Sequence, residues 1–217
     1  GKGTLMALTE KPTGYTVNTA HAKCPNHLYM LDDSTGGTTA ADQGKTGGLD
    51  LTLINSAMWG TADIVAGGAT SQIMSPNNTN NYYANSGTGF SAASSIMLVV
   101  MFRRNGAPAA NEAVCAVGIQ SDNTQYFAGR VTTTTGRVMA QYDDTNTTAI
   151  SRDAATTDYC DNAFHLAAYK AYESGGNVLI KSSADGSAWA GPSTSSVATT
   201  LPALNRIAVG RDGSLFS

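Results

Sequence analysis

Acidic and amide side chains gather in turn-rich stretches of the sequence, and oxygen ligands of this kind are the ones that calcium prefers. The candidate ligands form two sets: Asp32, Asp33 and Asp42, and Asp143, Asp144 and Asn146. Asp and Asn also cap tight turns by bonding to their own backbone, which explains both sets without an ion. We favour turn capping, so no obligatory cofactor is expected and calcium is the one metal kept as a candidate.

Aromatic side chains in polar loops are a second candidate site, because sugar rings stack on them while amides bond the hydroxyls. An Asn-rich loop carries the pair Tyr82 and Tyr83 together with Asn78 and Asn80, and Trp189 follows a predicted turn. The alternative is that the tyrosines cover an edge of the fold and that Trp189 fills one end of the core. We favour this packing interpretation and keep glycan binding as the alternative.

No catalytic constellation is recognised in the sequence. Glycoside hydrolysis needs two carboxylates that flank one bond, but Glu112 stands alone near a strand start and Glu173 lies beside a hairpin turn. A serine-nucleophile elbow, Gly-x-Ser-x-Gly, is absent as well. His165 lies within a predicted strand and is interpreted as structural rather than as a general base. We therefore predict no catalytic residue and no enzyme activity.

Three cysteines, Cys24, Cys115 and Cys160, are too few for a disulfide framework and too scattered for a zinc site. His21 and His27 flank the first of them, but this spacing lacks a fourth zinc ligand. Buried thiols are the favoured interpretation. One disulfide with one thiol left over stays open.

The composition excludes several classes of protein. The 217 residues include only 13% charged residues, and the formal net charge is −3 with a pI near 5.5. Such a chain has no basic face for nucleic acid or for anionic membranes. The longest apolar run, Ile96 to Phe102, is too short to span a bilayer. Nucleic-acid binding and membrane insertion are therefore not expected.

The elements that must position these residues are strands. Glu occurs three times and Gly 23 times, which favours short strands and turns over solvated helices. Leu49–Leu53 alternates as a half-buried strand does, and Ser95–Arg103 is apolar on both faces, which predicts a central strand packed on each side. Further strands are predicted at His27–Leu31, Asp63–Ala66, Ser71–Met74, Ala113–Gln120, Gln125–Thr132, Arg137–Asp143, Phe164–Tyr172, Val178–Ser182 and Asn205–Arg211. Many short strands at this spacing indicate a β-sandwich or barrel.

The order of these strands resembles the concanavalin A-like, laminin-G-like jelly-roll superfamily. The segments that carry the resemblance are His27–Asp32 with Gly36–Asp42, Ser94–Arg104, Phe164–Tyr169 leading to Asp185–Ser187, and Leu204–Arg211. The resemblance implies an all-β antiparallel sandwich over residues 27–217, preceded by an irregular N-terminal arm at 1–26. Retaining hydrolases of this fold carry a Glu-x-Asp-x-Glu run, which this sequence lacks. Family members also continue into a further strand where this sequence stops.

Two functional hypotheses follow from these observations. The first is a non-enzymatic structural or adhesion protein on the surface of a phage particle, a capsid decoration or a tail-associated protein. It would bind other virion proteins or copies of itself. It is motivated by the low charge, by the expectation that no signal peptide was cleaved from this sequence, which shows none, and by Gly1, the type of residue exposed when an initiator Met is trimmed. The alternative is an extracellular carbohydrate-binding module of a secreted or cell-surface bacterial protein.

Overall fold

The structure is a computed structural model that describes residues 18–29, 37–54, 59–63, 70–74, 84–90, 94–119, 122–144, 150–154, 156–195 and 200–210. All regular structure in these residues is β-strand. Among them no helix is long and apolar enough to cross a membrane. The strands are β1 (Thr39–Ala40), β2 (Leu51–Leu53), β3 (Trp59–Asp63), β4 (Thr70–Met74), β5 (Ala84–Ser86), β6 (Ser95–Asn105), β7 (Glu112–Ile119), β8 (Asp122–Val131), β9 (Val138–Asp143), β10 (Ile150–Asp153), β11 (Asp161–Ser174), β12 (Asn177–Ala184), β13 (Ala190–Thr194) and β14 (Arg206–Val209).

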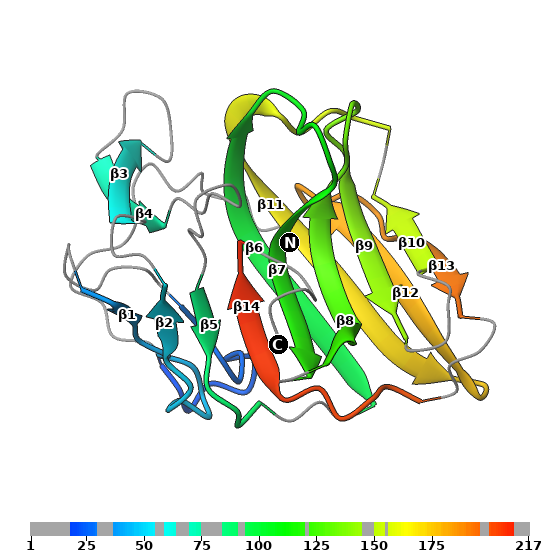
Figure 1. Ribbon diagram of the computed structural model, residues 1–217, viewed down its shortest axis with the longest axis horizontal. Helices are drawn as coiled ribbons and strands as arrows, with labels where there is room; N and C mark the ends of the chain where they lie inside the picture. The colour runs from blue at the N-terminus through cyan, green and yellow to red at the C-terminus, as the bar shows by residue number, and fades with distance from the viewer. Residues whose placement is uncertain are drawn as a thin grey trace, which may run out of the picture.

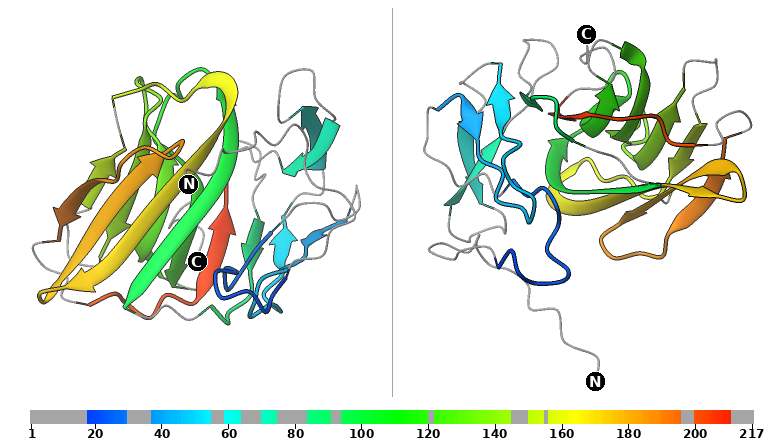
Figure 2. Two further views of the ribbon diagram at one scale, coloured as in Figure 1. Left: turned by 180° about the vertical axis from the view of Figure 1, so that it is seen from behind. Right: turned by 90° about the horizontal axis from the view of Figure 1, so that it is seen from below.

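Two antiparallel sheets face each other and form a sandwich (Figure 1). The larger sheet has eight strands in the order β1-β2-β5-β14-β7-β8-β9-β10, and the smaller has four in the order β13-β12-β11-β6. The pair β3-β4 forms a separate two-stranded sheet. The view from below in Figure 2 shows the two layers edge-on. The predicted all-β sandwich is thus confirmed.

The core lies between the two layers. Phe127, Tyr142, Tyr169 and Ile180 come from both sheets and are almost fully buried. Burial of a large apolar side chain contributes about 1.5–3 kcal/mol, so residues of this kind hold the layers together. β8 approaches the ring of Tyr169 at Gly129, where an added Cβ would overlap the ring. The close approach of the two sheets at this point therefore depends on glycine.

The predicted strands of the second half agree with β7, β8, β9, β11, β12 and β14 to within a few residues. Alternation was too short to indicate β1, β5, β10 and β13, which have two to five residues each. The prediction of a first strand at His27–Leu31 is wrong for residues 27–29, which have no regular structure, and residues 30 and 31 lie outside the described residues.

The prediction that Ser95–Arg103 is a central strand packed on each side is also wrong. β6 is the last strand of the four-stranded sheet, next to β11 (Figure 2, left). Ile96 and Phe102 face the core and are buried, whereas Met97, Val99 and Met101 face outward and are exposed. In β6, therefore, one of the two apolar faces lies in the core and the other is exposed to solvent.

All three cysteines are free, and two of them are buried. Cys115 lies in β7 against the core, and burial raises the pKa of its thiol to about 12. Cys160 is also buried, whereas Cys24 is half-buried. The prediction of buried thiols is confirmed for Cys115 and Cys160 and wrong for Cys24.

Candidate functional site

Among the residues that the structure describes, large exposed apolar side chains gather on the outer face of the four-stranded sheet. Met97, Val99 and Met101 on β6 are 59%, 52% and 46% exposed, and Leu166 on β11 is 46% exposed. Leu166 lies directly opposite Met101, and Ala168 lies opposite Val99. Directly opposite residues of an antiparallel pair share one face, so these side chains form one continuous surface, here called the outer apolar face.

Cations border the outer apolar face at both ends. At one end the Arg103 guanidinium lies over the Phe164 ring, 5.1 Å from its centroid. At the other end Lys170 and Lys181 both lie over the Tyr172 ring, with Nζ 5.0 and 5.4 Å from the centroid. Each cation is therefore held by an aromatic ring on the same face rather than extended freely into solvent.

The two lysines at one end of the outer apolar face have no matching negative charge beside them on the paired strands. The outward positions of β6, β11 and β12 around Lys170 and Lys181 include no Asp or Glu. At the other end Asp185, directly after β12, lies opposite Leu166 and accepts a 2.8 Å hydrogen bond from its backbone N–H. Within the described residues neither Lys170 nor Lys181 forms an ion pair. A surface that is apolar in the centre and carries two unpaired lysines at one end suits a partner that is apolar and acidic.

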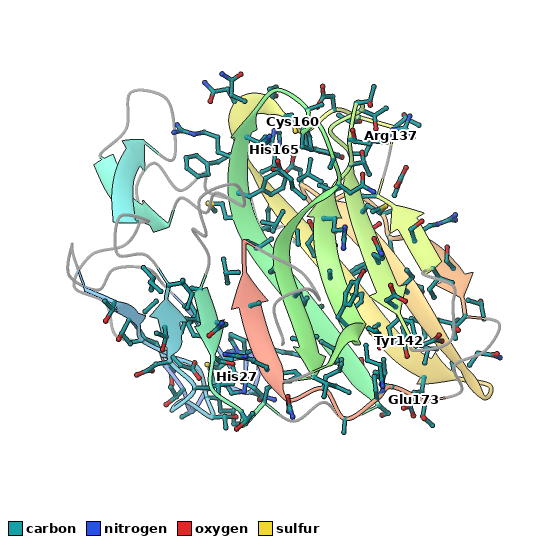
Figure 3. The ribbon with its side chains drawn as sticks, viewed as in Figure 1. His27, Arg137, Tyr142, Cys160, His165 and Glu173 are labelled. Atoms are coloured by element: carbon teal, nitrogen blue, oxygen red, sulfur yellow. The ribbon has the colours of Figure 1, made fainter. Side chains whose placement is uncertain are left out.

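His165 is the centre of a second cluster, at the end of the sandwich where Figure 3 labels it. Its Nδ1 lies 2.7 Å from Asp185 Oδ2 and its Nε2 lies 2.9 Å from Asp161 Oδ1. Burial opposes protonation, but the hydrogen bonds with Asp161 and Asp185 outweigh it and raise the pKa of His165. Both ring nitrogens can donate only in the imidazolium form, so the ion cluster joins β11 to the turn after β12.

Asp42 is the calcium candidate whose hydrogen bonds the structure describes most fully. Its carboxylate accepts hydrogen bonds from His27 Nδ1 at 2.7 Å and from the backbone N–H groups of Leu28, Gly44 and Leu49 at 3.0, 3.0 and 3.3 Å. Burial raises its pKa, but the hydrogen bonds from His27, Gly44 and Leu28 outweigh burial and lower the pKa. Asp42 therefore acts as the turn-capping interpretation predicts.

The other calcium candidates are only partly described. Asp143 ends β9, where burial and the neighbouring Asp144 raise its pKa against a hydrogen bond from Tyr126. Asp32, Asp33 and Asn146 lie outside the described residues. In the part of the chain that the structure describes, no group of three His, Cys, Asp or Glu could hold a metal ion. The described candidates Asp42, Asp143 and Asp144 therefore belong to no such group, and calcium binding stays a prediction.

Of the glycan candidates, only Trp189 lies in the described part of the chain. It is 41% exposed in the segment between β12 and β13. The favoured prediction that Trp189 fills an end of the core is therefore wrong. Asn78, Asn80, Tyr82 and Tyr83 lie outside the described residues, so their role stays a prediction.

The two isolated glutamates are both engaged in the fold. Glu112 Oε2 lies 2.9 Å from Arg104 NH1 at the start of β7, and Glu173 Oε1 accepts a 2.7 Å hydrogen bond from the backbone N–H of Leu201. Figure 3 labels Glu173 at the end of the sandwich away from His165. Glu173 therefore lies apart from the carboxylates that contact His165.

The outer apolar face was not predicted from the sequence, although the apolar residues on both faces of 95–103 were the signal that could have indicated it.

No protein family model matches the chain, and a search of curated proteins finds no match. Among solved structures, the chain is similar to endo-1,3-β-glucanase from Streptomyces sioyaensis, with 13% sequence identity and a TM-score of 0.43. The match covers 93% of this chain and 81% of that chain. At this TM-score the similarity transfers neither an activity nor a substrate.

The same finding corrects one prediction. A non-enzymatic chain was expected, but the similar structure is that of an enzyme, so the exclusion of enzyme activity is withdrawn. The comparisons give no support for a role in a phage particle. The similar protein is named for its action on a 1,3-β-glucan, and carbohydrate binding by this chain is considered below as a proposal.

Proposed function

We propose that this chain is a binding module that attaches to another protein through the outer apolar face. The supporting observation is that Met97, Val99, Met101 and Leu166 lie together and exposed on β6 and β11. Single exposed apolar residues are ordinary, but contiguous exposed apolar patches mark interaction sites. Covering the face would contribute about 25 cal/mol for each Å² of apolar surface removed from water.

The charges of the face indicate the chemistry of the partner. Arg103, Lys170 and Lys181 border the apolar centre, and the positions paired with Lys170 and Lys181 on β6, β11 and β12 carry no carboxylate. Two copies stacked face to face would bring like charges together, which costs free energy. The partner is therefore a protein surface or segment with an apolar centre and carboxylates at its border.

A pair of synthetic peptides tests this proposal. One alternates leucine with glutamate and the other alternates leucine with lysine, and binding is measured by isothermal titration calorimetry. The first peptide should bind at least roughly tenfold more tightly, because its carboxylates meet the lysines. Leu166→Glu should abolish binding and Lys181→Glu should reverse the preference. Ile54→Glu is the matched control, because Ile54 is similarly exposed (47%) beside β2.

The opposite results are equally clear. Equal binding of both peptides, or binding that Leu166→Glu leaves unchanged, would contradict the proposed face. The partner class is tested by sedimentation with anionic lipid vesicles. Binding to vesicles that depends on Leu166 would assign the face to a lipid surface instead of a protein.

Carbohydrate binding is a second candidate, and the exposure of Trp189 favours it. An exposed indole offers a flat surface on which the apolar face of a sugar ring can stack. A glycan array with and without calcium tests this candidate with the wild type, Trp189→Ala and the double variant Tyr82→Ala/Tyr83→Ala. Retention that only Trp189→Ala removes would place the site at Trp189. Retention unchanged by all three substitutions would rule out these aromatic residues as the site.

A further inference from the structure

β6 has an unpaired edge. In the described part of the chain β11 is its one neighbour in the sheet. The backbone N–H of Glu173 donates a 2.9 Å hydrogen bond to the carbonyl oxygen of Ser94 at the start of the ladder. Hydrogen-bonded pairs alternate along an antiparallel ladder, so the even-numbered residues from Ile96 to Phe102 direct their backbone groups toward β11. The odd-numbered residues Met97, Val99 and Met101 direct theirs toward the free edge.

The neighbouring ladder agrees with this assignment. The backbone N–H of Asp185 donates to the carbonyl oxygen of Leu166 at 2.8 Å, so the even-numbered residues of β11 bond to β12. The odd-numbered residues of β11 are thereby left to bond to β6, as Glu173 does. The outward backbone groups and the exposed side chains of β6 thus belong to the same three residues, Met97, Val99 and Met101.

This edge also lacks the features that usually protect an edge strand. Exposed edges are normally guarded by lysine, proline, a bulge or an inward-pointing charge, since an open edge pairs with other chains. From Ser95 to Phe102 the strand has no charged residue and no proline, and its register with β11 is regular. The edge is therefore suited to accept another strand.

The sequence of β6 is self-complementary about Val99. In an antiparallel pairing with a second copy about a two-fold axis at Val99, Met97 lies opposite Met101 and Ile96 lies opposite Phe102 of the other copy. Arg103 then lies opposite the uncharged Ser95, so no like charges meet. We infer that two copies of this chain pair antiparallel through the free edges of β6 and form a symmetric dimer.

Such a dimer joins the two four-stranded sheets into one continuous sheet. A two-fold contact between identical edges closes on itself and leaves no further edge of β6 open for growth. It also sets the two outer apolar faces side by side, so that the dimer would present one wider surface. The inference is independent of the proposed partner of that face, because it depends on the edge rather than on Leu166.

Sedimentation equilibrium over a range of protein concentrations tests the dimer. The wild type should be a dimer, and Val99→Pro should weaken association at least roughly 100-fold, because proline removes the outward N–H at the centre of the pairing. Val99→Ile keeps that N–H and should remain dimeric. Leu166→Glu should also remain dimeric, since β11 does not contribute to the edge.

A charge exchange at the axis keeps the test decisive even if Val99→Pro does not fold. Val99→Lys and Val99→Glu each place like charges against each other across the axis, so each variant alone should be monomeric. An equimolar mixture should form a dimer again. A monomeric wild type, a mixture that stays monomeric, or dissociation by Leu166→Glu but not by Val99→Lys would overturn the inference.

Discussion

Lys170 and Lys181 lie directly opposite each other on β11 and β12, with both ammonium groups over the ring of Tyr172. Like charges at directly opposite positions of an antiparallel pair are destabilising. The ring offsets part of this repulsion through its negative face. The pair therefore stores a small repulsion in the free protein that an acidic partner would remove.

Replacing one of these lysines should stabilise the free protein. Lys181→Glu converts the like-charge pair into an opposite-charge pair, and we expect a gain of about 0.5 kcal/mol in the free energy of unfolding. Urea denaturation at low ionic strength measures the gain, which added salt should reduce. Lys181→Gln should gain less. Loss of stability in Lys181→Glu would show that the contact with Tyr172 outweighs the repulsion.

Gly129→Ala should destabilise the sandwich. The added Cβ would overlap the ring of Tyr169, which is fully buried. Because the φ of Gly129 is not positive, the cost comes from space alone. Overpacking of this kind costs about 1–3 kcal/mol. Urea denaturation measures this cost.

The double variant Gly129→Ala/Tyr169→Leu separates crowding from a general weakness of β8. Leucine lacks the ring edge that the new methyl group would meet, so the two substitutions should cost less together than the sum of their separate effects. Strictly additive effects would contradict crowding between these two residues.

These core contacts show where sequence patterns stop being informative. Alternation predicted β11 and β12 well, since their inward residues, such as Tyr169 and Ile180, are buried between two layers. In β6 the pattern wrongly predicted a strand packed on both faces. An apolar residue type is the same in the sequence whether its side chain faces the core or the exposed surface. The prediction that Trp189 fills an end of the core was wrong for the same reason, because residue type alone does not distinguish a buried indole ring from an exposed one.

Long-range partners were the other part that the sequence did not reveal. The roles of Asp42 and His165 depend on groups 15 and 20 positions away, His27 and Asp185, that come together only once the chain has folded. Residue type predicted that Asp42 caps a turn and that His165 is structural. It could not predict that one histidine meets two carboxylates.

The stability of the fold should depend on the ionisation of His165. Its pKa is raised in the folded protein, so its contribution is complete below the pKa of about 6.5 in the unfolded chain. The contribution is lost as the pH rises through the higher folded-state pKa. We expect the free energy of unfolding to fall over this range in the wild type. Urea titrations between pH 5 and pH 9 measure it.

The comparison variant for this prediction is His165→Gln, which has no titrating ring. The difference in unfolding free energy between the wild type and His165→Gln should be largest near pH 6 and should shrink toward pH 9. A difference that grows with pH would mean that the neutral ring, rather than the imidazolium, is the form that the fold stabilises.

Asp42→Asn should loosen the segment that contains His27 without unfolding the sandwich. The carboxylate of Asp42 is fully buried and accepts hydrogen bonds from His27 and three backbone N–H groups. An asparagine amide would turn an N–H₂ group toward donors, and each charge-assisted hydrogen bond lost costs about 1.5–3 kcal/mol. Hydrogen exchange at Leu28, Gly44 and Leu49 should accelerate, while exchange in β8 and β11 should not change.

The matched control is Asp50→Asn, because among the described residues Asp50 accepts one hydrogen bond, from the backbone N–H of Asp42 at 2.9 Å. Its effect on exchange at Leu28 should be much smaller. Adding calcium is a second test, since a carboxylate that already accepts hydrogen bonds from four donors has little capacity left to bind a cation. Neither calcium nor a chelator should therefore alter exchange at Gly44. Protection of Gly44 by calcium in the wild type but not in Asp42→Asn would instead make Asp42 a calcium ligand.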